Sequence, residues 1–390
     1  MKRTHSKDDV TEVAEPDAKK QKVEEEKAEE KKVEEESANG FDPKKSITQN
    51  LLLPNSTLTP VDTTIHHSDT FEKHFFNISR MILNHTVLCA YNSSSGKTTR
   101  FRICEIEYYL TTTGEPDIHE DPFSHCHPLQ SKHGVWYFHQ SHGDSNNDNY
   151  RGGSYKGMDF TFNIENSPST YGGILIRGVE SISSNTYTDG PSKTVDTILK
   201  ATGADSIHDL ISNKFAHKDQ DIQSISIEKQ RSDYPLYLEY FTHPVEKPIF
   251  SSSRVGMSLK QNNLHQPRSR YVVKAYRHVI NPHVIKKGKN QLVVTMYHRL
   301  MTNKAKSKNV AFSEVGSKER LGVISQIVRN LGVTNKNAEK YIKDYESGRK
   351  NLVKMEDKKI DLTTEAMENF GRIPNGSQLC EMHGMFANFI

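Results

Sequence analysis

The chain is 390 residues long, which is enough for one large domain or two small ones with tails. Hydrophobic residues make up 34% of it and charged residues 26%. No apolar run reaches the roughly 20 residues that a membrane-spanning helix needs, so we expect no membrane span. Four cysteines without a CxxC motif favour free thiols in a reducing compartment. They are Cys89, Cys104, Cys126 and Cys380.

The charge is distributed unevenly. Residues 1–40 carry nine Lys/Arg against thirteen Asp/Glu and no aromatic residue, which predicts a disordered tail. The basic runs at 2–3 and 16–22 predict a nuclear-import signal and hence the nucleus; a solubilising tail is the alternative. Residues 265–354 carry twenty Lys/Arg against five Asp/Glu. This block indicates either a phosphate-binding face or a solvated surface.

The first predicted elements follow the tail in chain order. Residues 41–70 are rich in Ser, Thr, Pro and Asn, which predicts a linker or a strap lying on the next domain. A helix is expected at 69–83, because apolar residues recur there at the spacing of one helical face. These residues are Phe71, Phe75, Ile78 and Ile82.

Strand patterns then dominate the chain up to residue 284. The segment 99–110 alternates apolar and polar residues, and helical patterns at 194–199 and 206–215 interrupt the later strands. The predicted class is α+β, a single curved and mostly antiparallel sheet with flanking helices. Further strands are expected at 134–139, 158–164, 173–180, 224–227, 235–240 and 269–276.

A basic helical C-terminal extension is expected over 285–390. One helix at 317–331 and a second from Thr334 are separated by Gly332. The pair weakly resembles a helix-turn-helix, with ordinary core packing as the alternative. The expected inward residues are Leu321, Ile324, Ile327, Val328 and Leu331 in the first helix, and Ala338, Tyr341, Ile342 and Tyr345 in the second.

Candidate chemistry begins on the strand 99–110. Glu105, Glu107 and Tyr109 share one face of it, because side chains alternate with period two. An edge strand with its polar face in water is the alternative, and it is the commoner place for glutamate on a strand. The following strands, however, mix aromatic rings with His, Asn, Lys and Arg, as suits a pocket that holds a flipped planar base and binds its edge.

Seven short motifs in order resemble the methylpurine (3-methyladenine) DNA glycosylases over residues 76–284, slightly over half of the chain. They are Glu-x-Glu-x-Tyr at 105–109, a His in a Ser-containing loop at 124–125, Gly-x-x-Tyr-x-aromatic with Gly134 and Tyr137, an Asn at a strand end at 163, Ile-Leu-Ile-Arg at 174–177, Gly-Pro-Ser-Lys at 190–193 and Arg-Val-Gly at 254–256.

The resemblance implies a catalytic domain at 71–284 and a monofunctional DNA N-glycosylase of base excision repair. Such an enzyme flips alkylated purines such as 3-methyladenine and 7-methylguanine out of the duplex and hydrolyses their N-glycosidic bond. It needs no cofactor and no metal. The expected partner is DNA that contains alkylated bases, the expected state a monomer, and no membrane is involved.

The resemblance also implies the site residues. Glu107 matches the glutamate that activates the attacking water, and Arg177 matches the arginine beside that water. Tyr109 and His125 match residues that stack on and hydrogen-bond the base, and His139 stands where the family has a second stacking ring. Asn163 matches the asparagine that excludes guanine.

DNA contacts are expected outside the pocket. Lys193 and Arg254 fall in motifs that lie near the DNA backbone. Lys156 stands where the family wedges a tyrosine into the gap left by the flipped nucleotide, and the neighbouring Tyr155 is the alternative wedge. Asp159 has no family role; it is either a second acid/base or a polar strand residue.

Three alternatives stay open. The first is a metal site, because seven potential ligands crowd one region and Cys104 or Cys126 could join them. The second is a hydrolase of free modified nucleosides, which the departure at Lys156 favours. The third is a nucleic-acid-binding protein without catalysis. The potential metal ligands are His119, Asp121, His125, His127, His133, His139 and His142.

Overall fold

The structure, a computed structural model, describes residues 41–54, 67–112, 119–141, 150–165, 170–216, 225–257, 268–358 and 375–387. The predicted tail at 1–40, with its import signal, lies outside these residues, and so does His142. Residues from Pro43 to Ile390 form one compact unit. No helix within the described ranges is long and apolar enough to cross a membrane.

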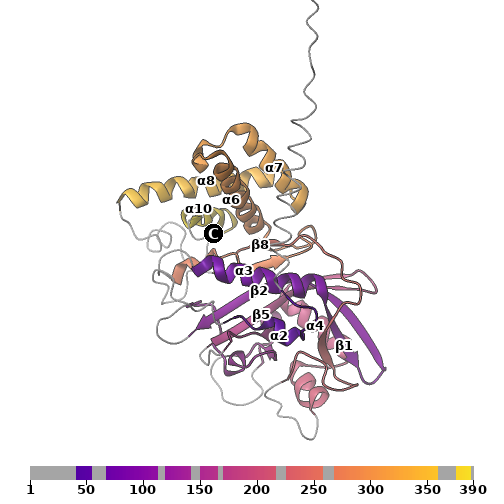
Figure 1. Cartoon of the computed structure of the whole chain (residues 1–390). Helices are drawn as coiled ribbons and strands as arrows, with labels where there is room; N and C mark the ends of the chain where they lie inside the picture. The colour runs from indigo at the N-terminus through magenta and orange to yellow at the C-terminus, as the bar shows by residue number, and fades with distance from the viewer. Residues whose placement is uncertain are drawn as a thin grey trace, which may run out of the picture. The chain divides into compact units, whose positions relative to one another are not determined.

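One nine-stranded sheet organises this unit, and every strand pair in it is antiparallel (Figure 1). The main path runs β3-β4-β5-β2-β1-β7, while β6 pairs with β5, and β9 pairs with both β2 and β8. The α+β class with a curved antiparallel sheet is therefore confirmed. The strands are β1 (Thr86–Asn92), β2 (Lys97–Thr112), β3 (Trp136–Phe138), β4 (Met158–Thr161), β5 (Thr170–Ser181), β6 (Tyr187–Asp189), β7 (Leu236–Tyr240), β8 (Phe250–Ser252) and β9 (Arg277–Val279).

Helices cover both faces of the sheet. On one face Phe75 of α3 stacks on Tyr108 of β2, with ring centroids 4.3 Å apart. Helix α4 packs against β5 and β1. It lies on the opposite face, because its residue Ala201 and Phe101 of β2 line the same pocket, whereas the adjacent Arg102, which points to the other side of the strand, donates to the backbone oxygen of Leu83 just after α3. The helices of this region are α2 (Ile47–Leu51), α3 (His67–Arg80), α4 (Pro191–Thr202) and α5 (Ile207–Asp209), with π-helical turns at Met81–His85 and Leu210–Phe215 and 3-10 turns at Pro128–Ser131, Gly153–Tyr155 and Arg268–Val272.

In the described part of the chain after the sheet, four helices share one hydrophobic core with the last strand. This core joins Val279 of β9 to Leu292, Ile327 and Tyr345 of three different helices, and Phe250 of β8 packs against it. We call these helices, α6 to α10, the helical unit. They are α6 (Lys289–Lys308), α7 (Ser317–Leu331), α8 (Asn335–Lys358) and α10 (Gly376–Met385), with a 3-10 turn at Phe312–Glu314.

Two of the predicted elements differ from the structure. The expected strand at 269–276 is a 3-10 turn followed by a loop, because its apolar run is buried against α10, where Val272 and Val273 pack with Met382 and Phe386. Burial of a short apolar run does not distinguish a strand from a buried turn. The expected strand at 224–227 is reduced to an isolated bridge at Ser226.

In α7 the predicted inward residues Ile327 and Leu331 are confirmed and Ile324 packs against the core, but Leu321 was wrong and Val323 takes the inward position instead. Leu321 is 62% exposed, whereas Val323, Ile327 and Leu331 are buried at the spacing of i, i+4 and i+8. The predictions for α8 are confirmed at Ala338, Ile342 and Tyr345, which are buried, and Tyr341 packs against the same core. The helix at 69–83 and the strands at 99–110, 173–180 and 235–240 are also confirmed.

Candidate active site

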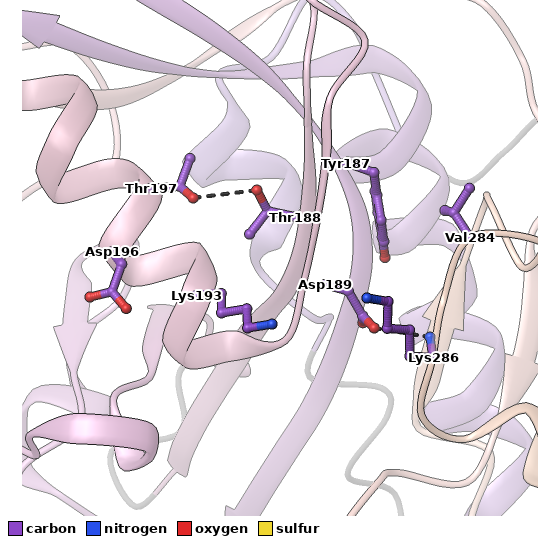
Figure 2. A pocket seen from close by; sticks show the side chains of 8 residues that line it. All are labelled: Tyr187, Thr188, Asp189, Lys193, Asp196, Thr197, Val284 and Lys286. Atoms are coloured by element: carbon purple, nitrogen blue, oxygen red, sulfur yellow. Dashed lines mark hydrogen bonds between the residues drawn. The ribbon is translucent and has the colours of Figure 1, made fainter.

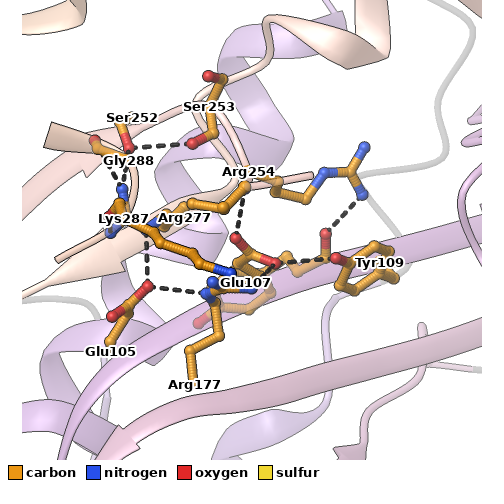
Figure 3. A network of polar contacts seen from close by, with 12 residues as sticks. Glu105, Glu107, Tyr109, Arg177, Ser252, Ser253, Arg254, Arg277, Lys287 and Gly288 are labelled. Carbon is orange, nitrogen blue, oxygen red and sulfur yellow. Dashed lines mark hydrogen bonds and ion pairs between the residues drawn. The ribbon is translucent and has the colours of Figure 1, made fainter. Parts of the chain in front are cut away.

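Glu107 lies in the middle of β2, where it has no exposed surface and three hydrogen-bond donors (Figure 3). The backbone N–H of Val255 donates to Oε1 at 2.7 Å, and the hydroxyl of Tyr109 donates to Oε2 at 2.9 Å. Arg177 on β5 reaches Oε2 at 3.4 Å. A buried carboxylate is tolerable only when it is paired and hydrogen-bonded, and these donors meet that requirement.

A second carboxylate two residues earlier holds the two arginines that surround Glu107. Oε1 of Glu105 accepts from Nε of Arg177 at 2.8 Å and from Nε of Arg277 at 2.9 Å. Burial alone would raise the pKa of Glu105, but Arg277 and Arg177 outweigh it, so this pKa lies below its usual value. The pKa of Arg177 is raised, because Glu107 and Glu105 together overcome the desolvation that would lower it. Glu105 and Arg177 are therefore both charged at neutral pH.

Tyr109 stands beside Glu107 and rests on a buried arginine. The guanidinium of Arg254 lies 4.6 Å from the centre of the Tyr109 ring. Burial, and next the charge of Glu107, raise the pKa of Tyr109 well above its usual value, so its hydroxyl stays protonated and donates to the carboxylate. The tyrosine ring is therefore held both at its hydroxyl and on one of its faces.

The expected DNA contact of Arg254 is wrong, because its side chain is 0% exposed. It forms a two-pronged ion pair with Asp121, and it also donates to the backbone oxygens of Tyr108 and Tyr271 at 2.9 and 3.1 Å. A side chain with these partners cannot reach a phosphate. Arg254 instead connects two parts of the site. It pairs with Asp121, at the start of the loop that leads to His125, and its guanidinium packs against the ring of Tyr109.

The facing wall of the site comes from β3 and β4. Cross-strand pairing aligns Tyr137, Asp159, Leu175 and Glu107 in one row across four strands, and paired residues point to the same face. Adjacent strands lie about 4.8 Å apart, so the backbones at Asp159 and Glu107 are separated by roughly 10 Å. Leu175 of β5 lies between them in the row and points to the same face.

Two histidines stand on this wall, and Asp159 holds one of them. Nε2 of His139 lies 2.8 Å from Oδ1 of Asp159, which is 2% exposed. The ring of His125 meets that of His139 edge to face, with centroids 4.5 Å apart, and its Nδ1 lies 3.2 Å from the hydroxyl of Tyr137. The pairing assigns Asp159 a place in the site: it orients the imidazole of His139.

Two glycines lie next to Asp159 and His139, and the absence of a Cβ atom at each glycine makes room for these side chains. A Cβ atom on Gly173, opposite Tyr109 in the sheet, would come within 2.8 Å of Oδ2 of Asp159. A Cβ atom on Gly157 would come within 2.4 Å of the ring of His139. Any larger residue at either position would push the facing wall away.

Asn163 lies just past the end of β4, and only the nitrogen of its side-chain amide has a hydrogen-bond partner among the described residues. Its Nδ2 donates to the backbone oxygen of Ser131 at 2.6 Å. Its Oδ1 is buried and has no hydrogen-bond partner among the described residues. An acceptor that is buried without a donor is costly, which is typical of a position that meets a ligand.

The two wedge candidates differ sharply in exposure. The ring of Tyr155 is 76% exposed at the end of a 3-10 turn. Lys156 forms an ion pair with Asp196 of α4 and keeps 19% of its side chain exposed. The turn is fastened to the same helix by the hydroxyl of Ser192, which donates to Gly153 O at 2.7 Å. Tyr155 is therefore the residue free to enter a neighbouring molecule.

Lys193 is exposed and lines an open pocket of about 570 Å3 next to the charged network. Figure 2 shows Lys193 and Lys286 on the two sides of Asp189, whose carboxylate accepts from the backbone N–H of Lys286 at 2.9 Å. Tyr187 lines the same pocket and points its hydroxyl at Glu105, 3.5 Å away. The expected phosphate contact of Lys193 is sterically open.

No protein-family model matches this chain. A similar curated protein is the "Uncharacterized protein L759" of Acanthamoeba polyphaga mimivirus, which is 29% identical over 217 residues, covering 53% of this chain and 89% of the viral protein. Since the viral protein has no named activity, the chemistry of the site has to be argued from its geometry.

The histidine-rich region does not assemble a metal site in the described part of the chain, where no three His, Cys, Asp or Glu side chains are placed to hold an ion. The histidines go to separate tasks. His119 is buried between the backbone oxygen of Leu110 and the hydroxyl of Tyr276, and burial lowers its pKa to about 3. His133 contacts the backbone of Thr48.

Several residues of the network escaped the sequence analysis. Arg277 lies opposite Glu107 in the register of β2 and β9 and forms its ion pair with Glu105, and Asp121 anchors Arg254. Arg277 has the same signal as Arg177, an arginine beside an apolar segment, but the expected strand ended at 276, one residue before β9 begins. Nothing in the sequence indicates that the backbone of Val255 would face Glu107.

Proposed function

We propose that this chain hydrolyses the N-glycosidic bond of alkylated purines in DNA, as a DNA N-glycosylase without strand cleavage. One observation carries the proposal: the buried carboxylate of Glu107 is held beside Tyr109 and Arg177, in the same sheet row as the wall that presents His125 and His139. An outward-facing Glu107, far from these residues, would have left no site at all.

The chemistry asked of Glu107 is modest. A purine methylated at N3 or N7 is already cationic, so it leaves as a neutral base when the bond to C1′ breaks. Water adds to C1′ and loses its proton to the carboxylate, and the carboxylate also stabilises the positive charge that develops on the sugar. A positioned general base contributes on the order of 10²–10⁴-fold to the rate.

Arg177 and Val255 position the carboxylate for this step. Their hydrogen bonds fix both oxygens of Glu107, so the group needs no reorganisation when the sugar becomes charged. Glu105 keeps Arg177 in place from the other side. We assign Glu107 a catalytic role and Glu105, Arg177 and Arg277 positioning roles.

The base would lie between Tyr109 and the two histidines. Stacking on aromatic rings is worth about 1–3 kcal/mol per base, and an imidazole offers a smaller ring than a phenol. Asn163 presents an unused buried acceptor at one edge of this space. It would accept a hydrogen bond from an exocyclic amine only where the base leaves room for its oxygen.

The test is release of 3-methyladenine and 7-methylguanine from alkylated duplex DNA, measured by chromatography. We expect release by the natural protein, and loss of release with retained DNA binding in Glu107→Gln. Glu239→Gln is the matched control, because Glu239 is a partly exposed carboxylate on β7 of the same sheet. Release that persists in Glu107→Gln would remove Glu107 from the catalytic role, and no release by the natural protein would refute the proposal.

Free modified nucleosides are the second candidate substrate, and the ion pair of Lys156 with Asp196 supports it, since a lysine held there does not wedge apart a duplex. Running the same assay on free methylated nucleosides separates the two. Faster turnover of the nucleoside than of duplex DNA would favour this alternative, while Tyr155→Ala should slow release only from duplex DNA.

A further inference from the structure

The first two-thirds of α8 combine a buried face and an exposed basic face. Helix α7 ends at Gly332, whose φ of +60° is the left-handed conformation that stops a helix. Two residues later Thr334 caps the next helix, since its hydroxyl accepts from the backbone N–H of Asn337 at 3.3 Å. The three-residue turn between α7 and α8 is the length found in helix-turn-helix modules.

The inner face of α8 fixes the helix against its neighbours. Its buried residues lie along one side of the helix and are at most 5% exposed; they are Ala338, Ile342, Tyr345 and Leu352. Helices α6, α7 and α10 all pack against α8. The packing leaves the opposite stripe of the helix in solvent.

That opposite stripe is basic and free of ion pairs. Lys336, Lys340 and Lys343 are exposed at the spacing i, i+4 and i+7. Among the described side chains, none of the three lysines has an acidic partner within ion-pair distance, although Glu339 is exposed on the same helix. Lys308 on α6, by contrast, pairs with a glutamate of α7. Three aligned lysines without an ion-pair partner are available to a ligand of opposite charge.

The surrounding charge points to a polyanionic partner. Residues 285–352 carry fifteen Lys/Arg against five Asp/Glu. From Lys336 to Lys343 the helix rises by about 10 Å, and the major groove of duplex DNA, about 12 Å wide, admits one α-helix. Asn335 and Asn337 are exposed beside the lysines at the start of the helix. Lysine binds guanine edges and phosphates, and asparagine binds adenine edges, so this face has both kinds of contact.

We propose that the exposed face of α8, from Asn335 to Lys343, binds duplex DNA in the major groove, as a second DNA-binding site of this chain. The site is separate from the Glu107 pocket and does not depend on base removal. Undamaged DNA is therefore a ligand of the chain in its own right.

The helical unit is also fastened to the network around Glu107. Arg277 donates to the backbone oxygens of Gly288 and Lys287 at 3.1 Å each, just before α6. Gln291 of α6 donates to the backbone oxygen of Arg254 at 2.8 Å. Both arginines border the Glu107 site, so DNA held by α8 is held by a body that is continuous with that site.

The experiment measures binding of the full chain to an undamaged duplex of about 20 base pairs, two helical turns, at several salt concentrations. Lys336→Glu/Lys340→Glu/Lys343→Glu should weaken binding and lower the slope of log K against log salt by about 0.9 for each phosphate that the variant no longer binds. The matched control is Lys304→Glu/Lys306→Glu/Lys318→Glu, three exposed lysines of α6 and α7 with the same charge change. Circular dichroism checks that both variants fold.

Equal weakening in both variants, or none in either, would overturn the proposal, because binding would then follow net charge or another surface. Tighter binding to RNA than to duplex DNA by the natural chain would also overturn it. A second variant, Asn335→Ala/Asn337→Ala, should reduce the preference among duplex sequences more than the salt slope. Base release from alkylated DNA is measured in parallel, so failure of this site and failure of the Glu107 site are seen separately.

Discussion

The network around Glu107 and the outer face of the helical unit differ in how their charged side chains are neutralised. In the network every charged group is buried and has a partner: Glu105 bridges two arginines, and Arg254 pairs with Asp121. On α8 Lys336, Lys340 and Lys343 are exposed and form no ion pair among the described residues. A buried charge has to be neutralised by its own protein, whereas an exposed one is neutralised by solvent ions or by a partner. The first arrangement therefore fixes its charges within the fold, and the second leaves its charges accessible from solvent.

Removing a partner from the buried network should have the largest effect on stability. Arg254→Met leaves the carboxylate of Asp121 buried without its cation, which costs about 3–5 kcal/mol of unfolding free energy. Denaturant melts of the full chain measure the change. The double variant Arg254→Met/Asp121→Asn should recover part of it, since an amide needs no counter-charge. A decrease under about 1 kcal/mol in the single variant would mean that the pair is not desolvated.

Acid should destabilise the sheet region through two buried histidines. Burial lowers the pKa of His119 and of His278 to about 3, against an ordinary value of 6.5. Between these values the unfolded chain binds more protons, so stability is lost as the pH falls below about 6.5. From pH 7 to pH 5 each histidine should cost about 2 kcal/mol. Melts at the two pH values should show a smaller difference in His278→Gln, and an unchanged difference would exclude His278 as a source.

Breaking an exposed ion pair of the helical unit should have the smallest effect. Lys308 and Glu319 join α6 and α7 at the surface. Exposed pairs often contribute nothing measurable, because solvent screens them and the side chains lose entropy when they pair. We expect the denaturation midpoint of Lys308→Ala to stay within the error of the measurement. A loss of stability as large as that of Arg254→Met would contradict the expected difference between buried and exposed ion pairs.

Local periodicity was enough to predict several elements of the fold. Helix α3, strand β2 and helix α8 could be read from the sequence, because each has an apolar face whose period reveals its geometry. The same period placed Glu105, Glu107 and Tyr109 on one face. The short strands β6, β8 and β9 were missed, since three residues show no period.

What the sequence by itself determined is therefore the class of the fold and one polar stripe on its central strand. Only the tertiary structure decided how that stripe is used: Arg277 of β9 pairs with Glu105, Asp159 holds His139, and Arg254 turns inward to Asp121 rather than outward to DNA. The reason is physical. Whether a charge faces water or a partner depends on strand register between segments that are 20 to 172 residues apart, and no local pattern encodes that pairing.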